Sequence, residues 1–266
     1  MKNLSGLHRR ILSAHTSTGV VRRAYWVKDQ SPHVPANAPV KASDRLSVSY
    51  GLLFASKANQ GVAEALRTID RTHRVPRDLY QLKVNVVGDT GSMGVYRAWE
   101  PHPDRSSILI NKHGKYPINT LVHEYGHFLD HRLFGIGKPT YSACASFQAT
   151  KDPNHELAPL MRAIYKSYSV RKLTEQHTRN KTEHNEPRLK TTTYMLRPQE
   201  LFARSYEQWV MRRQGSVQGV KGFLADANAW REHGYRAYWD RWEFDPIARE
   251  FDRLFQKRGL LRKGHK

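Results

Sequence analysis

Two histidines and a glutamate stand at a spacing that suits metal-assisted chemistry. Residues 119–134 read NTLVHEYGHFLDHRLF, which places His123, Glu124 and His127 in an HExxH pattern. On a helix, four residues advance by ~400°, so His123 and His127 lie ~40° apart and one turn along the axis. Both imidazoles could then reach one ion at ~2.0–2.1 Å. Glu124 lies ~100° around the helix, where it can act as general base for an attacking water.

The surroundings of this pattern favour a metal site. Leu121, Val122 and Phe128 make the segment strongly apolar, and histidines that are buried without partners are costly. The alternative interpretation is a pair of hydrogen-bonded core histidines. Asp130 lies seven residues after His123, on the same face but ~10 Å further along the axis. This position predicts that Asp130 partners a ligand histidine from outside the ligand set.

A third protein ligand must come from elsewhere in the chain. The metzincin pattern needs a histidine where this chain has Leu133, so that class is excluded. Glu200 follows Pro198 at the start of a segment that predicts a helix, and it would complete the His2Glu set of catalytic zinc sites. The alternative is an ordinary first-turn glutamate that complements the helix dipole. His177 and His184 could close a four-ligand structural site, although exposed loop histidines are the simpler interpretation.

Two short motifs resemble those of a known family. HEYGHFLDH and ELFARSYE are similar to motifs in the catalytic domain of anthrax lethal factor and in related zincin-like peptidases of toxins, phages and mobile elements. The resemblance covers about residues 105–258. It implies a zincin-like fold, one catalytic zinc ion held by His123, His127 and Glu200, and a catalytic tyrosine upstream of the third ligand. Tyr194 stands six residues before Glu200, whereas the family pattern has seven, a position held here by Thr193.

These residues together predict a zinc-dependent metallopeptidase that acts on a protein or peptide substrate. Glu124 would accept a proton from water and pass it to the leaving amine, while zinc and Tyr194 stabilise the oxyanion. The strand at 106–111 precedes the HExxH helix. We expect this strand, with Ile108 and Ile110, to bind an extended substrate by strand addition.

The order of the predicted elements indicates an α+β fold. Apolar residues at helical spacing, short runs with β-propensity and a long polar stretch divide the chain. We predict helices at 59–74, 117–133, about 157–164, 198–213 and 246–258, strands at 82–88, 93–99 and 106–111, and a loop at 171–192. They would form one zincin-like domain at 46–258, with a small mixed sheet, an active-site helix and C-terminal helices. A basic arm at 1–45 and a basic tail at 259–266 flank this domain.

The chain is strongly basic, since 44 Lys and Arg against 24 Asp and Glu give a net charge of +20. Such a chain is attracted to polyanions such as nucleic acid. The rival interpretation is therefore a basic nucleic-acid-associated or virion structural protein with an inactive zincin fold. A peptidase held on nucleic acid by its basic arms would reconcile the two interpretations.

One aromatic segment bears on this rival interpretation. Residues 230–244 interleave arginines with five tryptophan and tyrosine side chains, and such mixtures can stack nucleic-acid bases. These are Trp230, Tyr235, Tyr238, Trp239 and Trp242. The last four fall at helical spacing, which favours a buried helix face instead.

Cysteine content and hydropathy limit the setting of the protein. Cys144 is the single cysteine, so an intramolecular disulfide is excluded and a small packed residue is expected. No stretch approaches the ~20 apolar residues of a membrane span. The N-terminus has no continuous apolar stretch of the kind found in secretory signals. We therefore expect a cytoplasmic or virion-associated protein rather than a secreted toxin-like effector.

Overall fold

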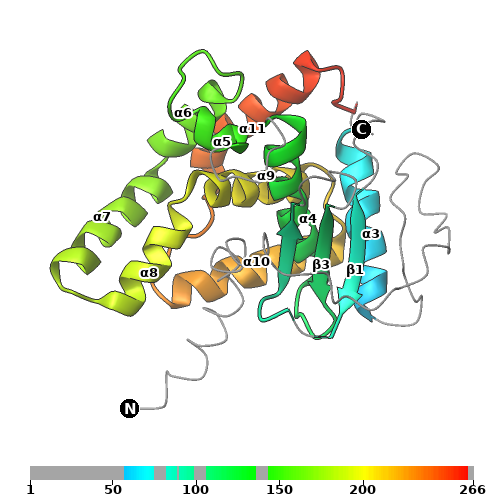
Figure 1. The fold of residues 1–266 in the computed structure, drawn as a ribbon, viewed down its shortest axis with the longest axis horizontal. Helices are drawn as coiled ribbons and strands as arrows, with labels where there is room; N and C mark the ends of the chain where they lie inside the picture. The colour runs from blue at the N-terminus through cyan, green and yellow to red at the C-terminus, as the bar shows by residue number, and fades with distance from the viewer. Residues whose placement is uncertain (1–56, 75–81, 89, 99–105, 136–142, 263–266) are drawn as a thin grey trace.

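The computed structural model describes residues 57–74, 82–88, 90–98, 106–135 and 143–262, and it confirms a mixed α+β fold (Figure 1). The predicted arm at 1–45 lies outside these residues. In chain order the elements are α3 (Lys57–Thr72), β1 (Lys83–Val87), β2 (Gly94–Arg97), β3 (Ser107–Asn111), α4 (Pro117–Phe128), a π-helical turn η3 (Leu129–Leu133), α5 (Ala145–Gln148), α6 (Ala158–Lys166), α7 (Tyr168–Thr182), α8 (Glu186–Met195), α9 (Pro198–Gln214), α10 (Val217–Glu232) and α11 (Arg241–Lys257). Among these residues, no helix is long and apolar enough to cross a membrane.

The sheet has three strands in the order β1-β3-β2, with β3 parallel to β1 and antiparallel to β2. β3 is therefore paired on both edges, and its Ile108 and Ile110 are fully buried. The prediction that this strand binds substrate by strand addition is wrong, because a central strand has no unpaired edge to offer. Its continuous apolar run is that of an interior strand.

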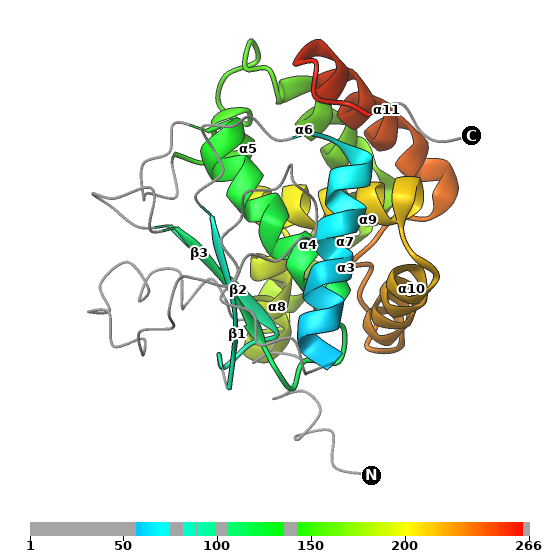
Figure 2. The same ribbon diagram turned by 90° about the vertical axis from the view of Figure 1, so that its right-hand side faces the viewer.

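Helix α4 is the central element of the fold. It contacts β2 and β3 on one side and α3 and α9 on others. Figure 2 shows the strands to the left of α4 and α10 to its right. Pro117 opens α4, and its apolar residues Leu121, Val122 and Tyr125 are buried in the core. The helix that carries the HExxH pattern is therefore held on several sides.

The predicted loop at 171–192 is instead an antiparallel pair of helices, α7 and α8, at the left of Figure 1. Ser167 caps α7 by accepting a hydrogen bond from Val170, and Asn185 caps α8 in the same way. The pair was missed because α7 buries few apolar residues, among them Val170 and Leu173, so its helical periodicity is weak.

The aromatic residues Tyr235, Tyr238 and Trp239 are buried as predicted, but they lie in the connection between α10 and α11 and not on a helix. Gly234 has φ +82°, and the N–H of Tyr235 bonds to the carbonyl of Trp230, which ends α10 in the usual glycine C-terminal motif. Asp240 then forms a capping box with Glu243, so α11 starts at residue 241 rather than 246. The helical spacing between these two signals is therefore coincidental.

The start of the predicted basic tail is tied to the body of the protein. The N–H of Arg74 bonds to the carbonyl of Leu260 at 2.7 Å, and the N–H of Arg262 bonds to the carbonyl of Thr72 at 3.2 Å. Arg262 also pairs with Asp70 at 2.6 Å. Residues 260–262 therefore pack against the end of α3, while 263–266 lie outside the described residues.

A fully buried histidine joins this end of α3 to α9. His73 Nε2 lies 2.7 Å from the Tyr206 hydroxyl, and Nδ1 lies 2.9 Å from the carbonyl of Arg74. Because a carbonyl only accepts, Nδ1 carries the hydrogen and Nε2 accepts from Tyr206. The ring packs against Trp209 and Phe255, with centroid distances of 6.0 and 4.4 Å. This histidine is a satisfied core residue.

Candidate metal centre

Three side chains from two helices converge beside α4. His123 and His127 project from α4, and Glu200 projects from the first turn of α9. His123 Nε2 lies 3.4 Å from Glu200 Oε2, and His127 Nε2 lies 3.4 Å from Glu200 Oε1. One potential ligand atom from each residue lies within 4.8 Å of the others, so the group could hold a metal ion. The predicted convergence of these three residues is confirmed.

The environment of Glu200 argues against a role limited to the helix dipole. Its side chain is 2% exposed and faces two imidazoles. A glutamate that only complements a helix dipole would stay in water, because burial of a carboxylate without partners is costly. Two imidazole nitrogens and one carboxylate oxygen make the His2Glu donor set, which fits Zn²⁺ by ligand type.

The pKa values of His123 and Glu200 are strongly coupled. Burial lowers the pKa of His123, but hydrogen bonds to Glu200 and Glu207, with the charges of Glu200 and Glu124, outweigh it and raise this pKa to about 10. Burial raises the pKa of Glu200, but both histidines outweigh it and hold this pKa well below its usual value. The carboxylate of Glu200 therefore favours a positive charge on the imidazole of His123. A divalent cation can supply that charge in place of protons.

Glu124 lies beside this cluster and outside the ligand group. Its Oε2 accepts a hydrogen bond from the backbone N–H of Tyr96 at 2.8 Å, and the side chain is buried. Burial raises its pKa, against the opposing charges of the two histidines. A carboxylate whose pKa is raised towards neutrality suits a general base.

A glycine allows β2 to lie directly against α4. A Cβ at Gly94 would stand 2.5 Å from Thr120 Cγ2 and 3.0 Å from Glu124 Cγ. No side chain fits in that space, so the β2 backbone approaches α4 closely enough for Tyr96 to reach Glu124.

Tyr194 also reaches the cluster. Its hydroxyl donates a hydrogen bond to Glu200 Oε2 at 2.6 Å. The tyrosine lies in the last turn of α8, and the chain turns at Leu196 before α9 begins at Pro198. The spacing of six residues therefore brings Tyr194 to the third predicted ligand.

Asp130 does not occupy its predicted place. Its carboxylate accepts hydrogen bonds from the N–H and the hydroxyl of Ser146, at 2.6 and 2.5 Å, and so holds the start of α5. Burial raises its pKa to about 6, although the Ser146 hydrogen bonds and the charge of His127 oppose the rise. Asp130 therefore acts on His127 through space and does not hydrogen-bond to a ligand histidine.

The carboxylate that partners His123 is Glu207, which was not predicted from the sequence. Its Oε2 lies 3.5 Å from His123 Nδ1, the nitrogen on the far side of the ring from Glu200. Glu207 lies seven residues after Glu200 on α9, which places both carboxylates within ~20° on one helix face. That spacing is the signal that could have found it.

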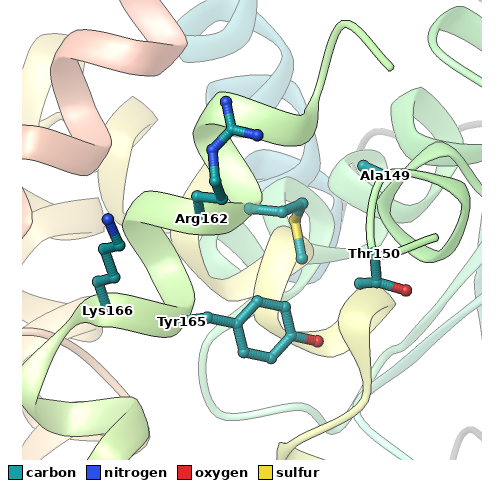
Figure 3. A pocket seen from close by; sticks show the side chains of 6 residues that line it. Ala149, Thr150, Arg162, Tyr165 and Lys166 are labelled. Carbon is teal, nitrogen blue, oxygen red and sulfur yellow. The ribbon is translucent and has the colours of Figure 1, made fainter. Parts of the chain in front are cut away.

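Other predicted candidates lie outside this cluster. His177 bonds to Thr192 between α7 and α8, and His184 is exposed at the turn that joins them. Burial raises the pKa of the Cys144 thiol well above its usual value, as expected for a packed residue. A hollow of about 470 Å³ between the α5 turn and α6 is drawn in Figure 3. Its lining residues are Ala149, Thr150, Met161, Arg162, Tyr165 and Lys166, none of which belongs to the metal group.

Comparison with protein-family models, curated proteins and solved structures finds no match for this chain. The likeness to zincin-like peptidases therefore stands on the two motifs and on the geometry of the residues that they contain.

Proposed function

We propose that this protein is a zinc-dependent metallopeptidase of the zincin type. The observation that carries the proposal is the convergence of His123, His127 and Glu200, with Glu124 next to them but outside the ligand set. The position of α4 between the sheet and α9 also suits a zincin-like fold. When bound, zinc would acidify a water molecule and polarise the substrate carbonyl.

Glu124 would act as the general base. It would take a proton from the attacking water and return it to the leaving amine. The hydrogen bond from Tyr96 fixes one of its oxygens and leaves the other to accept the proton. Burial keeps its pKa above the usual range, which matches this role.

Tyr194 would act as the donor to the oxyanion. Its hydroxyl is hydrogen-bonded to Glu200 Oε2, the oxygen that also faces His123. Metal coordination by that oxygen would weaken its hold on the phenol hydrogen, which could then turn towards a substrate oxygen. The structure thus supports a role for Tyr194 beyond the motif resemblance.

The test compares zinc content and peptide hydrolysis in three variants. We expect wild-type protein to hold about one zinc ion per chain and to cleave a mixed peptide library. Glu124→Gln should keep the zinc and lose about 10²–10⁴-fold in rate, whereas Glu200→Gln should lose both. Glu183→Gln, on the exposed α7–α8 turn, is the matched control and should keep both.

Two results would contradict the proposal. Wild-type protein that takes up no zinc would remove the metal centre. Protein that holds zinc through Glu200 but cleaves no peptide in the library would remove the peptidase activity and leave a metal-binding protein.

A second function, binding of single-stranded nucleic acid, is supported by one surface cluster. Tyr235, Tyr238 and Trp239 are buried and cannot stack bases, but Trp242 is 66% exposed. Its ring lies 6.2 Å from that of Tyr168, which has nearby cations from Lys172 and Arg236 at 5.6 and 4.9 Å. We name Tyr168, Lys172, Arg236 and Trp242 the Trp242 surface. An exposed ring next to a second ring with bound cations is typical of single-strand binding, and this function is compatible with the first.

A further inference from the structure

Tyr238 connects a part of the chain that carries no metal ligand to the candidate metal centre. Its hydroxyl lies 2.9 Å from Glu207 Oε2 and 3.0 Å from Asp226 Oδ2, and its single hydrogen can be donated to either carboxylate. The oxygen of Glu207 that it meets is the one that faces His123 Nδ1. A path of three contacts therefore leads from α10 through Tyr238 and Glu207 to a predicted metal ligand.

The backbone around Tyr238 is fixed to α9 on both sides. The Arg204 guanidinium donates to the carbonyl of Ala237. The side chain of Gln208 donates to the carbonyl of Trp239 at 2.8 Å and accepts from its N–H at 3.1 Å. Tyr238 therefore keeps its place relative to α9, the helix that carries both Glu200 and Glu207.

Helix α10 supports Tyr238 from the other side. The Phe223 ring packs edge-on against the Tyr238 ring, with centroids 4.8 Å apart. Two glycines let α10 approach α4, since a Cβ at Gly222 would stand 2.5 Å from Asn119 Oδ1 and a Cβ at Gly219 3.2 Å from Ile118 Cγ2. The carbonyl of Gly219 also accepts a hydrogen bond from Asn119 Nδ2. The hydroxyl is thereby held between Asp226 on one side and Glu207 on the other.

This arrangement affects how strongly His123 can bind a metal ion. An imidazole that gives its Nδ1 hydrogen to a carboxylate has its Nε2 lone pair free for a metal ion and becomes a stronger ligand. The distance between His123 Nδ1 and Glu207 Oε2 is 3.5 Å, near the outer limit of a hydrogen bond. A small displacement of Glu207 would therefore break the contact, so whatever fixes Glu207 also controls His123.

We propose that Tyr238 is a positioning residue for the metal centre, which holds Glu207 against Nδ1 of His123 and so strengthens metal binding by Nε2. The inference rests on the proposed zinc site but does not depend on the peptidase activity. It also assigns a role in the metal centre to the connection between α10 and α11, which contributes no ligand.

The test measures zinc affinity by competition with a chromophoric chelator. Loss of a partner behind a ligand histidine weakens zinc binding by about 10–100-fold. We expect Glu207→Gln to reach this range and Tyr238→Phe to weaken binding by about tenfold. The double variant should bind zinc no more weakly than Glu207→Gln alone, because both act through one path. Tyr165→Phe removes a tyrosine hydroxyl outside the site and is the matched control.

Cobalt(II) in place of zinc gives an absorption spectrum that a change in side-chain packing away from the metal would not alter. The visible absorption of the cobalt protein should change in Tyr238→Phe and stay as in wild type in Tyr165→Phe, since that spectrum reports the ligand field. Thermal unfolding of the metal-free variants separates a loss of folding from a loss of affinity.

The outcomes distinguish this inference from the proposed function. If wild-type protein binds no zinc, the metal centre itself is wrong. If wild type binds zinc through Glu200 but Tyr238→Phe leaves affinity and cobalt spectrum unchanged, the inference fails and the site stands. Additive losses in the double variant would show that Tyr238 acts by another route, which also overturns the inference.

Discussion

Gly126 of α4 packs directly on Ala203 of α9, and a Cβ at residue 126 would stand 3.0 Å from the Ala203 Cα. The glycine lies inside the HExxH pattern, immediately before His127. Because both helix backbones meet here, the contact sets the distance between the two histidines on α4 and Glu200 on α9. The glycine between His123 and His127 therefore helps to bring both histidines close to Glu200.

Replacement of this glycine should separate the two helices. In Gly126→Ala the added methyl would also stand 3.1 Å from the Tyr206 ring, so a backbone or a core ring must move. We expect a net loss of about 1–2 kcal/mol in unfolding free energy after the gain in helix propensity, and about tenfold weaker zinc binding. Chemical denaturation and chelator competition measure the two effects.

Gly88→Ala is the control for that variant, because a Cβ at Gly88 meets nothing within 4 Å. It should match wild type in both measurements. Wild-type zinc affinity in Gly126→Ala would show that the Gly126–Ala203 contact does not determine the ligand spacing.

Replacement of Gly94 should lower the rate of peptide hydrolysis without changing the zinc content. Gly94→Ala would press a methyl against Thr120 Cγ2 and Glu124 Cγ, and so push β2 away from α4. The hydrogen bond from Tyr96 to Glu124 would then lengthen. We expect peptide hydrolysis to fall about tenfold or more while zinc content stays at the wild-type level.

A compensating change makes this prediction sharper. Thr120→Ser removes the Cγ2 atom and keeps the hydroxyl that donates to the carbonyl of Tyr116. The Gly94→Ala, Thr120→Ser double variant should therefore recover part of the lost rate. No recovery, or a loss of zinc in Gly94→Ala, would mean that the glycine serves another purpose.

Positions within one helix could be predicted from the sequence more directly than contacts between distant helices. His123 and His127 share one helix, so their spacing alone fixed their relation. Glu200 was predicted from its place at a helix start and from the motif resemblance, because nothing local reports which helix packs on α4. Asp130 was misplaced because α4 changes into a π-helical turn at 129–133, where i→i+5 hydrogen bonds rotate the side chains that follow. An α-helical wheel does not hold through that change.

Acid should weaken the fold through His73. Burial, with the charge of Arg262, lowers its pKa to about 4 against the opposing hydrogen bond to the Arg74 carbonyl. The unfolded chain binds this proton near pH 6.5 and the folded protein near pH 4, so the contribution of His73 to stability falls as pH drops through this window. Full protonation costs about 3 kcal/mol relative to pH 7.

The difference between wild type and His73→Phe isolates this effect. Asp130 shifts in the opposite sense, because its raised pKa makes stability fall as pH rises from about 4 to about 6. The pH dependence of the unfolding free energy of the whole protein therefore contains opposing contributions from His73 and Asp130. Denaturation of metal-free protein at pH 7 and pH 4 should show the wild type losing about 3 kcal/mol more than His73→Phe. If wild type and His73→Phe lose the same unfolding free energy between pH 7 and pH 4, the lowered pKa of His73 is ruled out.

The Trp242 surface predicts a measurable affinity for single strands. Stacking contributes about 1–3 kcal/mol per base, so Trp242→Ala should weaken binding of a labelled single-stranded DNA by about 5- to 160-fold. Binding should also weaken steeply as salt rises. Leu224→Ala, at another exposed apolar side chain, is the control. Equal affinity in wild type and Trp242→Ala would assign any DNA binding to other parts of the chain.

The pairing of residues 260–262 with 72–74 has a consequence for how the protein opens. Backbone hydrogen bonds join the first and last of the described helical segments, and buried His73 connects the same corner to α9. Local opening of either segment breaks the contacts of the other, so both should belong to one cooperative unfolding unit. In amide hydrogen exchange, the N–H groups of Arg74 and Arg262 should therefore exchange with the same opening free energy.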